Sequence, residues 1–481
     1  MRWILPTHPD ARLLARMADD LRVPDFVAEL LLRRGFVDSG PASAFLHPRL
    51  RDLADPFLLP DMERAVARVL AAVDARQRIV LYGDYDVDGV TSIALLHAVL
   101  GALGVVPETF LPDRMEEGYG LSRNGVERCL RECRPELVIA VDCGTSSAAE
   151  IARIREQGIG VVVLDHHECK ELLPDCDAVV NPKRTGEFAY LCSVGVAFKL
   201  AHAMLKRRPV EGFDLRDHLD LVAVGTVADL VPMVDENRIL AAAGMQRLAR
   251  TTRVGLRELM TVAGVRPPVR PGDIGFRIGP RLNAAGRLGT ARAALELLLT
   301  TDPSRARTLA AGLELQNRER QAVERATLHE AEAGIAAGFD ATRDAAIVVG
   351  GRGWHQGVIG IVASRLMRTH HRPTFVVGFE DGMGRGSGRS VEGLSLVGAL
   401  TSIAGLLETF GGHEMAAGLT LREERFPEFA DAFRRVARES LTDDQLVPTL
   451  QLDAELSLAD VDESFLEEHD RLQPFGSANP Q

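Results

Sequence analysis

Four short acidic segments follow apolar, β-branched runs in this chain, and they constrain its fold more than any other feature. The segments are GDYDVDG at 83–89, VDCG at 141–144, LDHHE at 164–168 and GTVADLVP at 225–232. Runs such as RIVLY, LVIA and GVVV are typical of buried strands in a parallel α/β sheet, whose carboxyl ends share one edge where ligands bind. The sequence therefore predicts that widely separated acids meet at one edge of a sheet.

The predicted edge would hold an unusual number of acids together with two histidines. Its members are Asp84, Asp86, Asp88, Asp142, Asp165, His166, His167 and Asp229. So many carboxylates cannot all stay ionised unless a cation offsets their mutual repulsion. Aspartate oxygens and histidine nitrogens together suit Mn²⁺ or Mg²⁺. We therefore expect a hydrolase that uses two divalent ions.

Length and composition set broad limits on the protein. A chain of 481 residues exceeds what one hydrophobic core supports, so roughly two to four domains are expected. The six cysteines form no CxxC pair, which favours reduced thiols. No apolar run is long enough for a signal peptide or a membrane span, so we expect a cytoplasmic protein without a membrane partner.

Apolar periodicity organises the chain into helical and α/β regions. Residues 1–75 show the i, i+3, i+4 spacing of short helices, and from residue 76 strand-like and helical runs alternate in the α/β pattern. A Pro- and Gly-rich segment breaks this pattern near 265–281. Residues 301–340 then read as one long charged helix, and 341–445 as a second, smaller α/β unit with a Gly-rich turn.

Two stretches are rich in arginine although the net charge of the chain is −12. Residues 266–292 contain six arginines and one acid, and residues 351–390 contain six arginines and two acids. Basic stretches beside an acidic metal site are typical of a protein that binds an anionic polymer and directs it to the metal ions. Solvated surface arginines remain the simpler alternative for either stretch.

The first motif, GDYDVDG, allows two interpretations. In an extended segment alternate residues point the same way, so Asp84, Asp86 and Asp88 would lie on one side as metal ligands. Gly89 would then turn the chain into a helix that begins near Thr91. The alternative is an Asp-rich turn that caps this helix. Three acids exceed what one cap needs, so we favour metal ligands.

Ten motifs in fixed order resemble the DHH phosphoesterase superfamily, and in particular its exonucleases specific for single-stranded DNA. They are RGF…FLHPRL…DPFLLPDMERAV, GDYDVDG, PDRMEEGYGL, VDCGTS, DHHE, GTVADLVP, GPRLNAAGR, WHQGVIGIVASRL, GRGSGRS and GGHEMAAGL. The resemblance implies an α/β fold in which a parallel-sheet DHH domain at 76–300 is joined by the long helix to a smaller α/β DHHA1 domain. It also implies that 446–481 begins an OB-type domain, which this chain truncates.

The resemblance also implies roles for the acids and histidines. Asp142 resembles a carboxylate that bridges two ions, and His166 resembles a ligand. Asp165 or Asp229 would orient an imidazole by accepting its second N–H. His167 would act in catalysis, with contact to the scissile phosphate as one option. The implied metal ligands are Asp84, Asp86, Asp142, His166 and Asp229, and the implied catalytic set adds Asp88 and His167.

Basic and polar residues are implied to hold the substrate. Arg281, Asn283 and Arg287 would clamp backbone phosphates, because the guanidinium fork pairs with phosphate oxygens. Ser387 and Arg389 would hold a terminal phosphate or the nucleotide beside the cut, with a flexible hairpin turn as the alternative for this Gly-rich run. Three further contacts are implied at Arg114, His355 and His413. Packing of His355 with Trp354 is an equal alternative.

The implied function is 5′→3′ hydrolysis of single-stranded DNA in repair and recombination, with single-strand-binding protein and a helicase as partners. One alternative is a short-substrate phosphodiesterase of the same superfamily that acts on nano-RNA or cyclic dinucleotides. Those relatives are more compact, so the length of this chain favours the exonuclease. Another alternative is a replication scaffold that has lost catalysis, and the presence of every acid argues against it.

Overall fold

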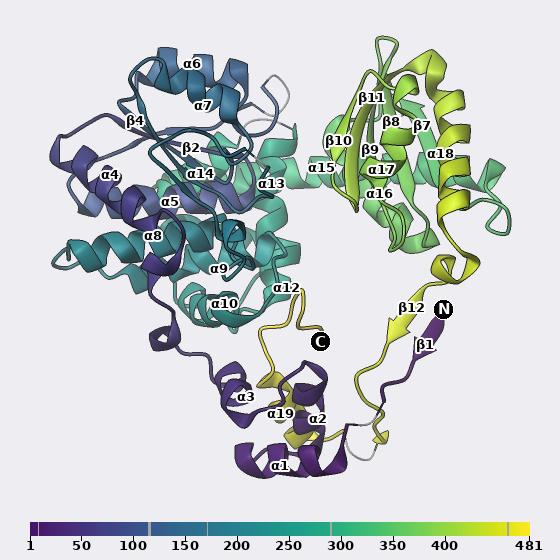
Figure 1. Cartoon of the computed structure of the whole chain (residues 1–481), viewed down its shortest axis with the longest axis horizontal. Helices are drawn as coiled ribbons and strands as arrows, with labels where there is room; N and C mark the ends of the chain where they lie inside the picture. The colour runs from purple at the N-terminus through teal and green to yellow at the C-terminus, as the bar shows by residue number, and fades with distance from the viewer. Residues whose placement is uncertain (8, 114–116, 171, 289–290, 459–460) are drawn as a thin grey trace. The chain divides into compact units, whose positions relative to one another are not determined.

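The computed structural model describes residues 1–7, 9–113, 117–170, 172–288, 291–458 and 461–481 (Figure 1). The chain forms two compact units. The larger unit comprises His8–Asn317 and Leu456–Gln481, and the smaller unit comprises Met1–Thr7 and Arg318–Glu455. Residues 446–481, for which we predicted the start of an OB-type domain, are divided between the two units.

A parallel five-stranded sheet lies at the centre of the larger unit. In spatial order its strands are β3 (Glu108–Phe110), β2 (Ile79–Gly83), β4 (Leu137–Val141), β5 (Gly160–Leu164) and β6 (Ala178–Val180). Every residue of β2, β4 and β5 is buried, which explains their unbroken apolar sequences. The predicted parallel α/β sheet is confirmed.

Helices cover both faces of this sheet, as Figure 1 shows. Alternate strand residues such as Leu81 and Ile139 pack against α4 (Met62–Asp74), α5 (Val87–Ala102), α8 (Ser193–Arg207) and α9 (Leu219–Ala228). The intervening residues, such as Val80, pack against α6 (Arg123–Cys133) and α7 (Ala148–Arg155). This two-sided burial fixes the register of each strand and so the position of its carboxyl end.

The N-terminal region is helical, as predicted, and it packs with the end of the chain. It contains α1 (Ala11–Leu21), α2 (Asp25–Arg33) and α3 (Ser39–Leu46), of which α3 was not predicted because its sequence contains Gly and Pro. The C-terminal helix α19 (Glu463–Asp470) contacts α2 through the rings of Phe26 and Phe465, whose centroids are 4.6 Å apart.

The rest of the larger unit is mostly helical. Helices α10 (Asp235–Leu248), α11 (Val254–Ala263) and α14 (Arg292–Leu299) complete its core. The predicted interruption at 265–281 is only partly correct, since the chain is helical from Pro271 onward through α12 (Pro271–Asp273), the π-helical η5 (Ile274–Ile278) and α13 (Gly279–Leu288). Proline is well suited to a first helical turn. Ile274, Ile278 and Leu282 are buried at four-residue intervals and hold this helix against the core.

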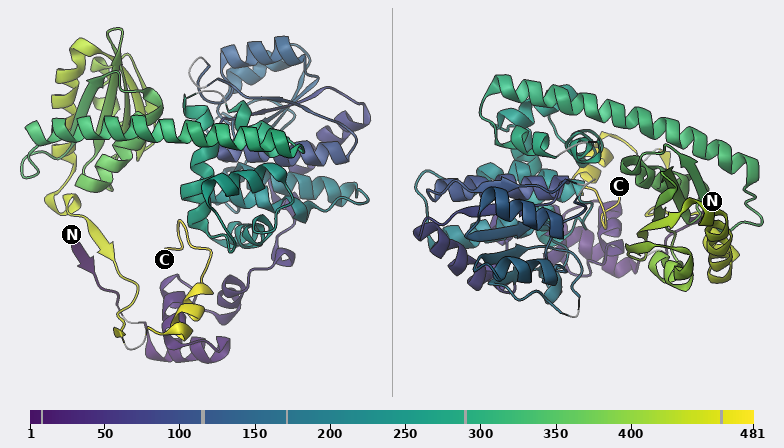
Figure 2. Two further views of the ribbon diagram at one scale, coloured as in Figure 1. Left: turned by 180° about the vertical axis from the view of Figure 1, so that it is seen from behind. Right: turned by 90° about the horizontal axis from the view of Figure 1, so that it is seen from above.

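The long helix was predicted correctly, and it is α15 (Pro303–Gly338). Its first part belongs to the larger unit, where Leu309 and Leu313 are buried. Its second part belongs to the smaller unit, where Ala331 and Ile335 are buried. Figure 2 shows the helix as one continuous rod. The local apolar contacts of each part explain why so charged a helix is stable.

The smaller unit contains a mixed five-stranded sheet in the order β10-β11-β9-β8-β7. The strands are β7 (Ile347–Arg352), β8 (Thr374–Glu380), β9 (Met383–Arg389), β10 (Thr409–Gly412) and β11 (Ala416–Arg422). Helices α16 (Gln356–His370), α17 (Leu396–Ser402) and α18 (Phe426–Ser440) accompany them. A short parallel pair, β1 (Arg2–Ile4) with β12 (Thr449–Gln451), also belongs to this unit.

The Gly-rich segment of the smaller unit is a strand, which corrects the predicted turn. Residues Met383–Arg389 form β9, and only Asp381 and Gly382 make the turn from β8. The glycines make room for neighbouring rings, because a Cβ at Gly388 would lie 2.5 Å from the ring of Phe375. Among the described residues, no helix combines the length and the apolar character needed to cross a bilayer.

Candidate metal centre

The carboxyl ends of the central strands present the predicted acids. Asp84 directly follows β2, Asp142 follows β4 and Asp165 follows β5. All three are almost completely buried. Asp229 comes from a different element, because it follows the last residue of α9. The sheet and α9 therefore bring together acids that lie up to 145 positions apart in the sequence.

The first motif differs from the predicted extended segment. Helix α5 begins at Val87, so Asp86 is its N-cap and Asp88 lies in its first turn. The side chain of Asp86 accepts a hydrogen bond from the backbone N–H of Gly89 at 3.1 Å. Gly89 is helical and does not make the turn; a Cβ there would lie 2.5 Å from the carbonyl oxygen of Asp84. The capping interpretation is thus correct for Asp86 and does not exclude a metal role.

Asp142 belongs to two groups of side chains that could each hold a cation. One group is Asp84, Asp86 and Asp142, and the other is Asp142, His166 and His167. Within each group the ligand atoms lie within 4.8 Å of one another. Asp142 adopts a left-handed backbone conformation with φ of 62°, which is uncommon for a residue other than glycine. A carboxylate shared by two groups is what a bridging ligand requires.

The ring of His166 faces three carboxylates. Its Nε2 lies 3.4 Å from Asp142 Oδ1, 3.7 Å from Asp229 Oδ2 and 3.9 Å from Asp88 Oδ2. The buried Oδ2 of Asp229 accepts no hydrogen bond from any side chain or backbone group that the structure describes. A buried carboxylate oxygen without a donor is costly unless a cation binds it. These atoms therefore fit a divalent ion.

The N-terminus of α8 supports the centre, and the sequence interpretation missed it. Asp88 accepts backbone hydrogen bonds from Ser193 at 2.7 Å and from Val194 at 2.8 Å. The Ser193 hydroxyl donates to Asp142 Oδ1 at 2.9 Å. Cys192 also lies near Asp88 and Asp229, but burial raises the pKa of its thiol well above the usual range. A neutral thiol is a poor ligand for Mn²⁺ or Mg²⁺.

His167 has its own hydrogen-bond partners. Its Nδ1 lies 2.7 Å from Asp165 Oδ1, so Asp165 orients His167 rather than His166. Asp165 also accepts the backbone N–H of Thr145 at 2.9 Å. The Tyr119 hydroxyl lies 3.0 Å from His167 Nε2 and donates to the backbone carbonyl of Asp142 at 2.8 Å. Tyr119 was not predicted as a site residue, although it lies in the PDRMEEGYGL motif.

Burial and mutual repulsion raise the pKa values of the central acids. Burial, with the charge of Asp86, raises the pKa of Asp88 to about 7. Burial, with the charges of Asp88 and Asp86, raises the pKa of Asp229 to about 9, and the pKa of Asp142 also rises well above its usual range. These acids remain ionised together at neutral pH only if cations join them.

The two histidines differ in their electrostatic surroundings. Burial lowers the pKa of His166 to about 4, so its ring is neutral and can donate a lone pair to a metal. Burial is the largest single influence and disfavours charge on both His167 and Asp165, but their mutual hydrogen bond and charge attraction, with further favourable contacts, together outweigh it. The net result is that the pKa of His167 is raised and that of Asp165 lies well below its usual range. His167 can therefore present an N–H donor.

The raised pKa values predict how the metal-free protein responds to pH. Because the folded protein holds protons on Asp88 and Asp229 that the unfolded chain releases near pH 4, the stability that these two acids contribute is fully present only below that pH. It is lost as pH rises through about 7 for Asp88 and about 9 for Asp229. We expect the Tm of the chelator-treated protein to fall by at least about 3 °C between pH 6 and pH 9.

Differential scanning calorimetry with and without Mg²⁺ tests this expectation. Bound Mg²⁺ offsets the charge of carboxylates that have lost their protons. The difference in Tm between the two samples should therefore widen as pH rises. A Tm of the metal-free protein that stays level or rises over this range would contradict the assignment.

The predicted phosphate contacts of the larger unit lie on or near α13. Arg281 donates to Glu314 at 2.6 Å, and Asn283 accepts the backbone N–H of Val87 at 3.2 Å, which ties α13 to the start of α5. Arg287 is partly buried on the same helix. Arg114 lies outside the described residues.

The predicted contacts of the smaller unit lie on separate elements. Ser387 and Arg389 lie on β9, where the guanidinium donates to the Ser387 hydroxyl at 3.2 Å and to the Gly388 carbonyl at 2.7 Å. His355 caps α16 by accepting the backbone N–H of Gly357 at 3.0 Å. His413 is exposed after β10.

Two family models match the chain, one in each unit. Residues 78–226 match the model described as "DHH family, N-terminal domain", and residues 344–439 match the DHHA1 domain. The first segment contains the acidic motifs up to Thr226, and the second contains Ser387, Arg389 and His413.

Curated relatives and solved structures are similar over the whole chain. The "Single-stranded-DNA-specific exonuclease RecJ" of Bacillus subtilis is 39% identical over 100% of this chain and 61% of its own length. The protein of the same name from Dickeya dadantii is 38% identical over 98% of this chain and 85% of its own length. The crystal structure of RecJ from Thermus thermophilus in complex with Mn²⁺ has a TM-score of 0.87 at 33% identity, and it covers 100% of this chain and 68% of that chain. A second structure of that protein contains Mg²⁺.

Proposed function

This chain belongs to the RecJ family of single-stranded-DNA-specific exonucleases, and we propose that it hydrolyses single-stranded DNA from the 5′ end with the help of divalent metal ions. The chain spans 61% of the length of the Bacillus subtilis relative, so this activity is proposed for the part present here. The observation that carries the proposal is Asp142, whose carboxylate is shared by two groups of potential metal ligands.

We propose that the centre holds two ions, Mn²⁺ or Mg²⁺. The ligands would be Asp84, Asp86, Asp142, His166 and Asp229, with Asp88 beside them. Bound divalent ions supply a hydroxide-like nucleophile at neutral pH and offset the charge that grows on the phosphate. The raised pKa values of Asp142 and Asp229 and the neutral His166 ring support this ligand set.

The protein groups around the centre would orient the reacting phosphate. Asp165 holds Nδ1 of His167 and so fixes its ring, and the Nε2–H, which lies near the Tyr119 hydroxyl, would donate to a phosphate oxygen in place of that hydroxyl. The Ser193 hydroxyl holds one oxygen of Asp142, and the backbone N–H groups of α8 hold Asp88. Because these contacts exist before substrate binds, little reorganisation accompanies the reaction.

Arginine and polar side chains would bind the strand without reading its sequence. Arg281, Asn283 and Arg287 would contact backbone phosphates, and Ser387 with Arg389 would hold the terminal phosphate. His355 and His413 are further proposed contacts, and Arg114 stays a prediction. The partners predicted from the family, single-strand-binding protein and a helicase, also stay predictions. Similarity over the whole chain, including its N-terminal helices, favours the exonuclease over a short-substrate phosphodiesterase.

Timed digestion of one oligonucleotide tests the proposed function. The strand would carry a label at either end, and it would be supplied single-stranded and as a duplex in the presence of Mn²⁺. The proposal expects mononucleotide release from the 5′ end of the single strand and little hydrolysis of the blunt duplex. Release from the 3′ end, or equal rates on both substrates, would contradict it.

Replacing Arg389 with alanine should weaken recognition of the strand end. We expect KM to rise by about 10- to 100-fold, since a charge-assisted contact to phosphate is worth roughly 1.5–3 kcal/mol. The preference for a 5′-phosphate over a 5′-hydroxyl strand should also shrink. Arg422→Ala removes an exposed arginine of the neighbouring strand β11 and serves as the matched control. Unchanged KM and end preference in the Arg389 variant would rule out this role.

A further inference from the structure

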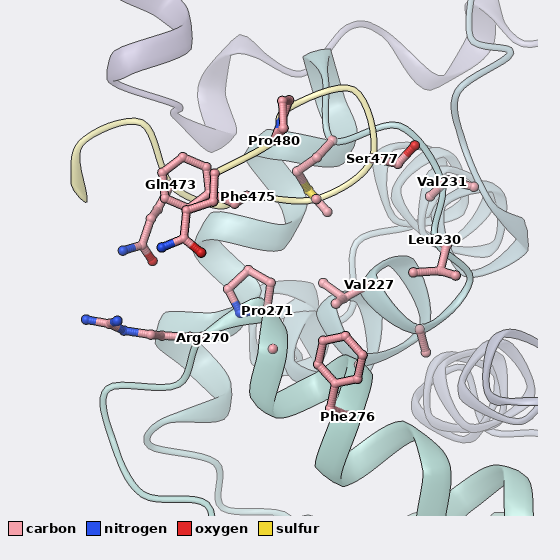
Figure 3. Close-up of a pocket in the computed structure, with 16 residues that line it drawn as sticks. Val227, Leu230, Val231, Arg270, Pro271, Phe276, Gln473, Phe475, Ser477 and Pro480 are labelled. Carbon is pink, nitrogen blue, oxygen red and sulfur yellow. The ribbon is translucent and has the colours of Figure 1, made fainter. Parts of the chain in front are cut away.

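A pocket of about 580 Å³ lies beside the loop that carries Asp229 (Figure 3). Val227 and Leu230, close neighbours of Asp229, line one side, and Pro271 and Phe276 of α12 and η5 line another. The C-terminal segment contributes Phe475 and Ser477. All of these residues belong to the larger unit. The lining residues Val227 and Leu230 therefore flank Asp229, one of the proposed metal ligands, in the sequence.

Specific hydrogen bonds hold the C-terminal wall of the pocket in place. The backbone N–H of Met233 donates to the carbonyl of Ser477 at 2.7 Å. The buried guanidinium of Arg238 donates to the carbonyls of Leu472 and Gln473 at 2.9 and 2.7 Å. The side-chain amide of Asn479 donates to the carbonyls of Leu472 and Pro474. These hydrogen bonds fix the wall of the pocket before any ligand binds, and ligand sites are usually preformed in this way.

Two large apolar side chains of the pocket are mostly exposed. Phe276 is 83% exposed, whereas Ile274 and Ile278 on the same helical turn are fully buried. Leu230 is 73% exposed and has a left-handed backbone with φ of 60°, which is strained for a branched side chain. A strained backbone and an exposed apolar side chain in the loop that carries Asp229 together indicate that this loop binds a ligand.

A positive charge accompanies this apolar surface. Arg270 lines the same pocket, and its side chain is 61% exposed. Its contact with Asp470 spans 3.7 Å between exposed groups and is therefore weak. An exposed ring with an available guanidinium suits a ligand that has a flat aromatic part and a phosphate. A nucleotide of a DNA strand has both.

We propose that this pocket binds a nucleobase of the DNA strand under digestion, with the base stacked on Phe276 and a neighbouring phosphate bound by Arg270. This inference rests on the proposed function and adds a base-stacking site to it. A strand bound at the candidate metal centre would present its bases to the pocket at high effective concentration.

Substrates with one missing base test the proposal. In a set of otherwise identical oligonucleotides, one abasic nucleotide is placed at successive positions from the 5′ end, and KM for the first cleavage is measured. The wild-type protein should show a rise of about 5- to 100-fold at one or two adjacent positions, because stacking of one base is lost there. In Phe276→Ala the KM for the intact strand should rise by a similar factor and the position dependence should disappear.

Controls separate this proposal from its alternatives. Phe276→Tyr keeps a ring and should restore the position dependence, and Val106→Ala removes an exposed apolar side chain near the amino end of β3 and should change nothing. Identical abasic profiles for the wild type and Phe276→Ala would overturn the proposal and favour another occupant, such as a protein segment. A wild-type protein that cleaves no strand would instead contradict the proposed function.

Discussion

Replacing Asp142 with asparagine should lower kcat by at least about 10³-fold while single-stranded DNA still binds. Asp142 is the one acid shared by the Asp84–Asp86 group and the His166–His167 group of the described residues. Asparagine keeps the size of the side chain and still accepts the Ser193 hydrogen bond, but it removes the negative charge. Both cation sites should therefore weaken together.

Asparagine is also the substitution that separates catalysis from folding most cleanly. It tolerates the left-handed conformation of position 142 better than alanine does. Because Asp142 is a buried acid with a raised pKa, the neutral variant should have an equal or higher Tm without metal. Asp381→Asn, at an exposed left-handed position of the smaller unit, is the matched control. A variant at 142 that keeps more than about a tenth of the wild-type kcat would remove Asp142 from the reaction.

Removal of divalent ions with a chelator should stop hydrolysis entirely. The buried acids Asp88, Asp142 and Asp229 would then take up protons or repel one another, and His167 alone cannot supply a nucleophile. Addition of Mn²⁺ or Mg²⁺ in excess of the chelator should restore activity. The loss should be reversible because separate hydrophobic cores, and not the ions, hold each unit together.

Two measurements make the chelator experiment decisive. Circular dichroism should show that the treated protein stays folded at pH 6, where the central acids can hold protons. Titration with Mg²⁺ should recover the full rate. Hydrolysis that persists after exhaustive dialysis against chelator would exclude the metal mechanism.

The strand-end acids could be predicted from sequence because two strong patterns coincide there. Buried parallel strands read as unbroken apolar runs, and an acid directly after such a run must lie at the carboxyl edge. Asp84, Asp142 and Asp165 lie there in the structure. The long helix α15 was equally predictable, since it contains strong helix formers and no proline after its first position.

Other features could not be predicted because tertiary contacts decide them. Gly89 was interpreted as a turn residue, yet glycine is needed there because the backbone of Asp84 approaches it too closely for a Cβ. The glycines of β9 were interpreted as a turn, yet Gly384 and Gly388 make room for rings of β8. Ser193 and Tyr119 reach the centre only through packing of α8 and of the loop after β3. Nothing local distinguishes Phe276 from a core residue, since its exposure depends on the π-helical turn around it.

Equilibrium binding of Mn²⁺, followed by electron paramagnetic resonance, tests the central claim most directly. The claim is that acids and an imidazole from separate elements form one site for a pair of divalent ions. The wild-type protein at pH 8 should bind two Mn²⁺ per chain, and Asp142→Asn should bind at most one with an affinity comparable to the wild type. Binding of no Mn²⁺ by the wild type, or an unchanged stoichiometry and affinity in the variant, would contradict the account.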